Sequence, residues 1–206
     1  CKLGIEASRV RMDIDPVPRK EELVRVLKSG AELGIYEDKP TGEADDTLAI
    51  VNSVIDFSVR DYPPVDEAQA DFDRLKAELV KARATGDEDR VAAAAWPARR
   101  AELALHHAKL FGGGKVEIWI QAIRLGPIAL VATPLEPFAE IGRAIRQGSP
   151  APYTAFSGYS NGYYGYMPTA DAFPLGGYEV TTSPYRPDAA DRLVAVSADT
   201  LGKLWS

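Results

Sequence analysis

The feature that most constrains the fold is a strand–turn–strand pattern near the middle of the chain. Apolar residues occupy every second position from Val116 to Ala122, as in a strand that buries one face. The sequence "LGPI" then turns the chain into a second segment, Ile128–Ala132, which is apolar throughout. Such a continuous run is typical of a strand in the interior of a sheet. The chain therefore contains a β-sheet, and its other segments have to pack against that sheet.

Helices are predicted both before and after these strands along the chain. The segment from about 65 to 110 is rich in Ala and Leu and is interrupted once, at "TGDED", which predicts a helical hairpin. Pro97 is expected to kink the second arm of this hairpin or to mark its true start. Three further helices are predicted: Lys20–Gly34, the segment with Pro137 in its first turn and Gly148 past its end, and a C-terminal helix beginning near Pro187 or Asp188.

Two more segments have the pattern of strands. The first, "TLAIVNSVIDFSV", alternates strongly and is stopped by Pro63 and Pro64, and the second is the short segment "YTAFSG". The order of elements predicts an α/β fold, a mixed sheet with flanking helices and an inserted helical hairpin. In such folds the functional side chains gather on loops at the ends of strands.

Composition excludes two classes of partner. A net charge of −6 argues against a nucleic-acid-binding surface, which needs clustered positive charge. No apolar run approaches the ~18 residues of a membrane span, so no transmembrane segment is expected.

The chain starts at Cys1, its only cysteine, so no disulfide can form within it. Three interpretations of this residue remain open: the boundary of a fragment, the lipidation site of a cleaved lipoprotein, or the N-terminal nucleophile of an autoprocessed hydrolase.

Three places carry side chains suited to chemistry. Glu136 follows a predicted buried strand, the segment Gly158–Thr169 ("GYSNGYYGYMPT") contains four tyrosines, and Tyr178 stands beside a glutamate. Each has a simpler interpretation: a carboxylate that stabilises a helix N-terminus, an amphipathic tyrosine patch, and a packing residue. His106 and His107 are adjacent on a predicted helix, where their side chains diverge by ~100°. We therefore interpret these two histidines as surface or packing residues.

Three segments in order carry a family resemblance: "IQAIRLGPIALVATPLEPFAEIGRAIR", "FSGYSNGYYGYMPTADAF" and "GGYEVTTSPY". Together they resemble the catalytic region of the neutral (non-lysosomal) ceramidase superfamily, including its bacterial ceramidase-like members. The similarity covers about Glu117–Pro184 and is weaker upstream. It implies that residues 1–206 are the C-terminal portion of a ceramidase-like catalytic domain.

The resemblance implies a zinc amidase that cleaves an N-acyl bond. In that family two histidines, a glutamate and a tyrosine hold the metal, and the last two correspond to Glu136 and Tyr166. Tyr178 corresponds to the tyrosine that stabilises the oxyanion. A phenol, whose pKa is ordinarily ~10, needs a nearby cation to ionise at neutral pH, and a loop rich in Gly and Asn can carry it to one. The other tyrosines of the segment are expected to be walls or packing residues: Tyr159, Tyr163 and Tyr164.

The chain departs from the family pattern at several points. The histidine motifs of the family are absent, "PLEP" replaces a Pro-Gly-Glu junction, and no run of small residues follows "GGYEV". We therefore expect a histidine-bearing N-terminal segment or partner chain to complete the site. The changed motifs leave the amidase class in place but do not fix the substrate as a sphingolipid, so we expect a ceramide-like or another N-acyl amide substrate.

Three hypotheses follow for function. The first is a zinc-dependent amidohydrolase to which this chain supplies part of the metal site. The second is an N-terminal-nucleophile hydrolase that uses Cys1, and the third is a non-catalytic module that binds lipid or carbohydrate. The family resemblance favours a secreted, periplasmic or membrane-surface location.

Overall fold

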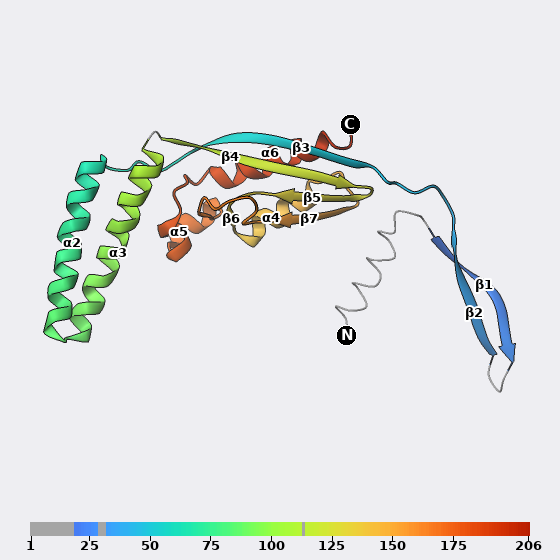
Figure 1. Cartoon of the computed structure of the whole chain (residues 1–206), viewed down its shortest axis with the longest axis horizontal. Coiled ribbons are helices and arrows are strands. Elements are labelled where there is room, and N and C mark those ends of the chain that lie inside the picture. The colour runs from blue at the N-terminus through green and yellow to red at the C-terminus, as the bar shows by residue number, and fades with distance from the viewer. Residues whose placement is uncertain (1–18, 29–31, 113) are drawn as a thin grey trace.

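A four-stranded mixed sheet forms the centre of the chain in the computed structural model, which describes residues 19–28, 32–112 and 114–206 (Figure 1). Its strands lie in the order β3 (Leu48–Ser58), β4 (Lys115–Leu125), β5 (Ile128–Ala132) and β7 (Tyr153–Ser157). The pairs β3–β4 and β4–β5 are antiparallel, and β5–β7 is parallel. These strands confirm the α/β fold and the mixed sheet predicted from the sequence.

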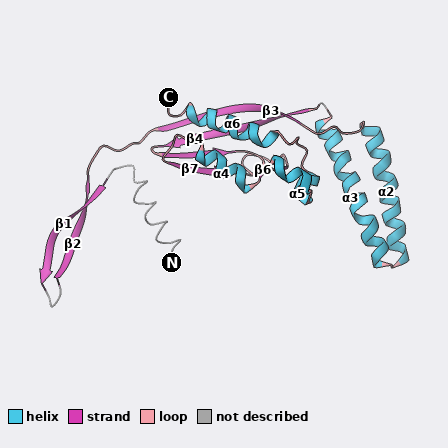
Figure 2. Cartoon of the chain, turned by 180° about the vertical axis from the view of Figure 1, so that it is seen from behind, coloured by secondary structure: helices cyan, strands magenta, loops and turns pink. Residues whose placement is uncertain are grey.

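One face of this sheet is covered by two helices, α4 (Ala139–Gln147) and α6 (Ala189–Gly202) (Figure 2). The inward side chains of β4, such as Ile118 and Ile120, are fully buried beneath them. Burial of side chains of this size contributes about 1.5–3 kcal/mol each, so this layer is the main source of stability. As predicted, Gly148 follows α4 and Asp188 precedes α6.

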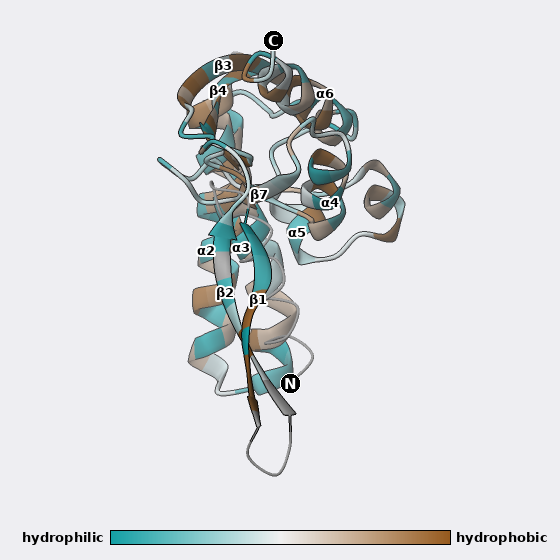
Figure 3. Cartoon of the chain, turned by 90° about the vertical axis from the view of Figure 1, so that its right-hand side faces the viewer, coloured by the Kyte–Doolittle hydropathy of each residue, from teal (hydrophilic) through white to brown (hydrophobic). Residues whose placement is uncertain are grey.

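The opposite face of the sheet is exposed among the described residues. Ile50, Val54 and Trp119 lie on it with 56%, 45% and 57% of their surface accessible. Figure 3 shows hydrophobic stretches along β3 and β4. Among the described residues, none of the helices combines the length and apolarity that crossing a membrane would require.

The helical hairpin is confirmed as α2 (Val65–Thr85) and α3 (Glu88–Phe111), which project from one end of the sheet (Figure 1). Gly86 turns the chain with a φ of 69°, and the Asp87 side chain accepts a hydrogen bond from a backbone N–H of the first turn of α3. Pro97 lies inside α3, so it does not mark the start of that helix as one of our two expectations had it.

The helix predicted for Lys20–Gly34 is wrong. Over its described residues this segment belongs to two antiparallel strands, β1 (Arg19–Lys28) and β2 (Glu32–Pro40). A shift in register between Leu23 and Arg25 breaks the alternation of β1, and the broken alternation mimics helical spacing. The pairing partner lies in the following segment, where the apolar spacing of β1 alone could not indicate it.

A partly buried contact joins His107 of α3 to Tyr62, in the segment between β3 and α2. The Tyr62 hydroxyl lies 3.0 Å from Nδ1 of His107, and the two rings meet edge to face. Burial lowers the pKa of His107 to about 4, with the nearby positive charge of His106 and of Arg60 acting in the same direction. His107 is therefore neutral in the folded protein at neutral pH.

This neutral histidine makes the stability of the fold depend on pH. Because the pKa of His107 is lower in the folded than in the unfolded chain, its contribution is present above about pH 6.5 and is lost as the pH falls towards 4. We expect up to about 3 kcal/mol of this acid loss to disappear in His107→Gln, measured by urea unfolding at several pH values. The exposed neighbour provides the control, since His106→Gln should retain most of the loss. An acid loss in His107→Gln equal to that of the wild type would contradict the prediction.

Candidate functional site

The site lies beyond the ends of the parallel strands β5 and β7. Both strands run in the same direction, so Ala132 and Ser157 bring the chain out at the same edge of the sheet. The backbone N–H of Thr133 donates to the carbonyl of Ser157 and keeps the two exits together, at 3.0 Å. This is the place where α/β sheets most often carry functional loops.

Backbone pairing brings Glu136 and Tyr166 together. The short strands β6 (Glu136–Pro137) and β8 (Tyr166–Met167) are parallel, with Glu136 opposite Tyr166 in the register. The N–H of Glu136 donates to the carbonyl of Gly165 at 3.0 Å, and the N–H of Phe138 donates to the carbonyl of Met167 at 3.1 Å. The prediction that Pro137 lies in the first turn of α4 is wrong, because Pro137 lies in β6 and α4 begins at Ala139.

The tyrosine segment is held in an unusual backbone conformation. Tyr159 and Asn161 have φ values of 54° and 63°, in the left-handed region that a bulky side chain rarely adopts. The N–H of Tyr159 donates to the carbonyl of Leu135 at 2.9 Å, and the N–H of Tyr164 donates to the carbonyl of Pro134 at 2.8 Å. These bonds hold the segment against the chain that leads to Glu136, and so they stabilise an otherwise costly backbone.

Three phenols surround the Glu136 carboxylate. The hydroxyl of Tyr163 donates to Oε2 of Glu136 across 3.4 Å, and the rings of Tyr159 and Tyr163 are stacked with centroids 5.3 Å apart. A hydrogen bond to Glu136 raises the pKa of Tyr159, whereas burial first and the Glu136 charge second raise the pKa of Tyr163 to about 12. Burial and then Glu136 also raise the pKa of Tyr166. Without a cation, these phenols stay protonated beside the carboxylate.

Tyr178 joins the pair through Tyr166. It begins the short helix α5 (Tyr178–Thr182), and its ring meets that of Tyr166 edge to face with centroids 5.9 Å apart. On its other side the ring of Trp96, from α3, lies 6.4 Å away. The structure thus brings together all three residues selected from the sequence: Glu136, Tyr166 and Tyr178. Their roles as metal ligands and oxyanion donor remain predictions.

A hollow of about 540 Å³ opens beside these tyrosines. Tyr166 and Tyr178 form one side of it, and residues of α3, among them Arg99, form another. The sequence analysis missed the α3 wall because α3 lies far from the tyrosines along the chain and nothing in its own pattern shows where it docks.

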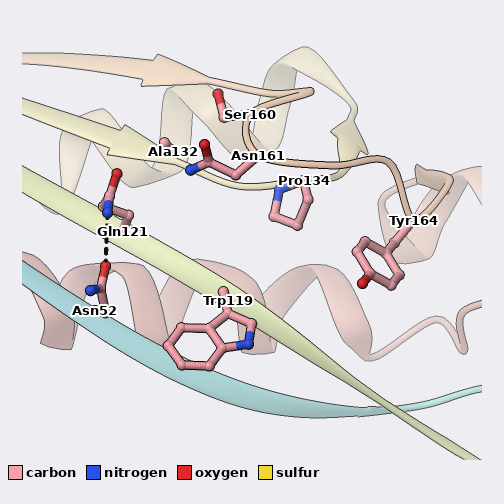
Figure 4. Close-up of a pocket in the computed structure, with 8 residues that line it drawn as sticks. All are labelled: Asn52, Trp119, Gln121, Ala132, Pro134, Ser160, Asn161 and Tyr164. Atoms are coloured by element: carbon pink, nitrogen blue, oxygen red, sulfur yellow. Dashed lines mark hydrogen bonds between the residues drawn. The ribbon is translucent and has the colours of Figure 1, made fainter.

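A second hollow, of about 240 Å³, lies on the exposed face of the sheet (Figure 4). Trp119 and Gln121 of β4 line it together with Asn161 and Tyr164 of the tyrosine segment. The Gln121 amide donates to the side-chain oxygen of Asn52 across the strands at 3.0 Å. Tyr164 borders both hollows.

The oxygen ligands fit one part of a divalent metal site. A carboxylate and a phenol opposite each other in paired strands offer two hard oxygen donors, and a cation would favour ionisation of the phenol. In the described part of the chain, however, no group of three or more His, Cys, Asp or Glu is placed to hold a metal. A zinc ion usually needs four ligands, so these residues fit zinc only if further ligands come from outside the described residues.

The two histidines do not provide those ligands as a pair. His107 is buried against Tyr62 and His106 is exposed, which confirms the interpretation of both as packing or surface residues. Both line the 540 Å³ hollow from α3, across from the tyrosines. Cys1, the proposed nucleophile of the second hypothesis, lies outside the described residues.

Comparison with known proteins gives few matches. No protein-family model matches the chain, and no curated protein sequence does. Among solved structures, "Ceramidase complexed with C2" is 24% identical over 45% of this chain, with a TM-score of 0.39. The neutral ceramidase from Pseudomonas aeruginosa is 23% identical over 44%, with a TM-score of 0.40. The chain spans only 15% and 16% of the length of those two structures.

The raised phenol pKa values give a test of the site geometry in the metal-free protein. Glu136→Gln removes the negative charge beside Tyr163, so the pKa of Tyr163 should fall from about 12 towards its ordinary value of about 10. Because burial is the larger cause, we expect part of the elevation to remain. Site-resolved NMR of the tyrosine rings would measure the change. Glu140→Gln, which removes the same charge from α4, should leave the pKa of Tyr163 unchanged, and an equal effect of both variants would contradict the geometry.

Proposed function

We propose that this chain is the part of a zinc-dependent amidohydrolase that supplies Glu136 and Tyr166 as oxygen ligands and Tyr178 as a hydrogen-bond donor to the substrate. The observation that supports this most directly is the register of β6 and β8, which pairs the glutamate with the tyrosine. Two residues thirty positions apart, selected for one shared role, lie opposite each other. The order of the motifs in the sequence supports the same proposal.

The remaining ligands would come from a histidine-bearing segment or partner chain. Glu136 and Tyr166 are each half-buried, and Tyr163, which lies beside Glu136, is exposed. Nitrogen ligands added at this surface would complete a four-coordinate site. On this proposal, the chain holds a carboxylate–phenol pair without a full ligand set among its described residues because another segment or chain supplies the rest.

The reaction would be the hydrolysis of an N-acyl amide. Water adds its oxygen to the carbonyl carbon, the carbon–nitrogen bond breaks, and the nitrogen takes up both protons of the water, giving a carboxylate and an ammonium ion. Zinc, when bound, would polarise the carbonyl and make water more acidic. The hydroxyl of Tyr178, beside Tyr166, would donate a hydrogen bond to the carbonyl oxygen as it gains negative charge.

The stacked rings of Tyr159 and Tyr163 favour one alternative, a non-catalytic module. Both residues are more than half exposed, and paired aromatic rings of this kind can bind lipid or carbohydrate. Ligand binding that persists after chelation, without turnover of any N-acyl amide, would support that alternative. The Cys1 hypothesis has a separate signature, because Cys1→Ala would then abolish hydrolysis and Tyr166→Phe would not.

Metal analysis tests the ligand assignment directly. In the assembled protein we expect about one zinc per site, and Glu136→Gln and Tyr166→Phe should each weaken zinc binding by at least about tenfold, since each removes one ligand. Competition against a chelating dye would measure this affinity. Tyr164→Phe removes a hydroxyl from the same segment and should leave zinc affinity unchanged. Absence of zinc from the assembled protein would overturn the proposal.

The proposed role of Tyr178 differs from that of the ligands in its effect on activity and on zinc content. Tyr178→Phe should lower kcat by about a hundredfold, the effect typical of removing one oxyanion donor, while zinc content stays at the wild-type level. Steady-state kinetics combined with metal analysis of the same preparation would measure both. Loss of zinc in Tyr178→Phe would instead assign the residue to the metal site.

A further inference from the structure

The 540 Å³ hollow is lined by both apolar and polar side chains. Its apolar side is formed by Leu103, Leu110, Phe111 and Val116. Helix α3 also contributes Arg99 and the two histidines, and Tyr166 and Tyr178 contribute phenols. Its volume falls within the range of sites that take small organic molecules. The hollow therefore has room for an apolar chain next to the residues proposed to carry the chemistry.

Among the described residues that line the hollow, Arg99 is the one with a permanent charge. Of the described residues that border the hollow, none is an aspartate or a glutamate, and both histidines are neutral or exposed to solvent. A ligand that enters this space therefore meets a positive charge in the wall, and the carboxylate that pairs with this charge, Glu102, lies outside the lining. An anionic group on the ligand would be favoured there.

Helix α3 holds Arg99 close to Tyr178. Trp96, whose ring lies 6.4 Å from that of Tyr178, is one helical turn before Arg99, so the two side chains share a face of α3. Glu102 is the main cause that raises the pKa of the Arg99 guanidinium, and Tyr178 acts in the same direction, as expected of a residue near it. The guanidinium is thus next to the residue proposed to bind the reacting carbonyl.

The ion pair of Arg99 with Glu102 leaves this group able to bind a ligand. Nη1 of Arg99 lies 2.6 Å from the Glu102 carboxylate, and both side chains are about half exposed, at 50% and 51%. Exposed pairs of this kind contribute little stability. A guanidinium has five N–H donors, and Glu102 is bonded to one nitrogen only.

We infer that Arg99 binds a carboxylate of the substrate and that the preferred substrates are N-acyl amino acids. This inference rests on the proposed function. In such a molecule the carboxylate carbon is two bonds from the amide nitrogen, so a group that binds it has to lie beside the oxyanion donor, as Arg99 does. The acyl chain would lie along the apolar side of the hollow. Hydrolysis would release a fatty acid and a free amino acid.

Two nearly isosteric substrates test this assignment in the assembled protein. N-lauroylglycine carries a carboxylate where N-lauroylethanolamine carries a hydroxymethyl group. We expect the wild type to prefer N-lauroylglycine in kcat/KM, and Arg99→Gln to lose about tenfold or more on that substrate alone. Arg99→Lys should recover part of the loss, because it keeps the charge without the planar fork. Arg90→Gln, on the same helix and outside the hollow, should leave kcat/KM for both substrates unchanged.

The possible failures are distinguishable. Equal turnover of both substrates, or an equal loss on both in Arg99→Gln, would overturn the inference and leave the proposed amidase intact. If neither substrate is hydrolysed, calorimetric measurement of N-lauroylglycine binding to the metal-free protein still tests whether Arg99 binds the carboxylate. Binding that Arg99→Gln weakens and Arg90→Gln does not would support the role of Arg99, and equal binding by all forms would overturn it.

Discussion

The site depends on one element of backbone pairing, the parallel contact between β6 and β8. A two-residue ladder is weak by itself, but here the carbonyls of residues 133–135 also accept hydrogen bonds from the tyrosine segment. Tyr185, fully buried beneath the segment, donates its hydroxyl to the carbonyl of Tyr164 at 2.7 Å. Glu136 and Tyr166 therefore take their positions from the backbone rather than from their own side-chain contacts. A site built in this way keeps its geometry when its side chains change charge.

In the absence of a cation, the charge of Glu136 makes ionisation of the neighbouring phenols unfavourable. Burial first and the Glu136 carboxylate second raise the pKa values of Tyr163 and Tyr166, so both phenols are harder to ionise. A divalent cation would reverse this relation, because it stabilises the carboxylate and the phenolate together. The same arrangement is thus unfavourable for a bare anion pair and favourable for a shared ion. This is the physical basis on which we propose that Glu136 and Tyr166 act together.

Local sequence patterns predicted much of the fold, because most elements form from residues that are neighbours in the chain. The alternation of β3 and β4 and the Ala-rich arms of α2 and α3 each occupy one continuous segment. The hairpin of β1 and β2 was not predicted, because the register shift at Leu23 disturbs the alternation of β1 and because β2, with which β1 pairs, is a separate segment. Pairing between segments is not visible in the periodicity of either one.

For the candidate site too, the sequence indicates some residues and not others. Glu136 and Tyr166 could be selected from the sequence because motif resemblance marks them, whereas Arg99 carries no local mark of function. Its position beside Tyr178 comes from the docking of α3 against α5, a contact between distant parts of the chain. The left-handed backbone of Tyr159 was equally hidden, since a tyrosine gives no sign of the positive φ that its hydrogen bond to Leu135 stabilises.

The position of the helical hairpin has a consequence for how such a site can vary. The strands β3 and β4 are antiparallel neighbours, yet the chain between them forms α2 and α3 instead of a tight turn. One wall of the hollow is therefore an insertion, while Glu136 and Tyr166 belong to extensions of β5 and β7. Substitutions along α3 can alter the charge and shape of the hollow without disturbing the pairing of β6 with β8. On our proposals, the groups that perform the reaction and those that select the substrate are carried by separate elements of the fold, and each can change while the other is preserved.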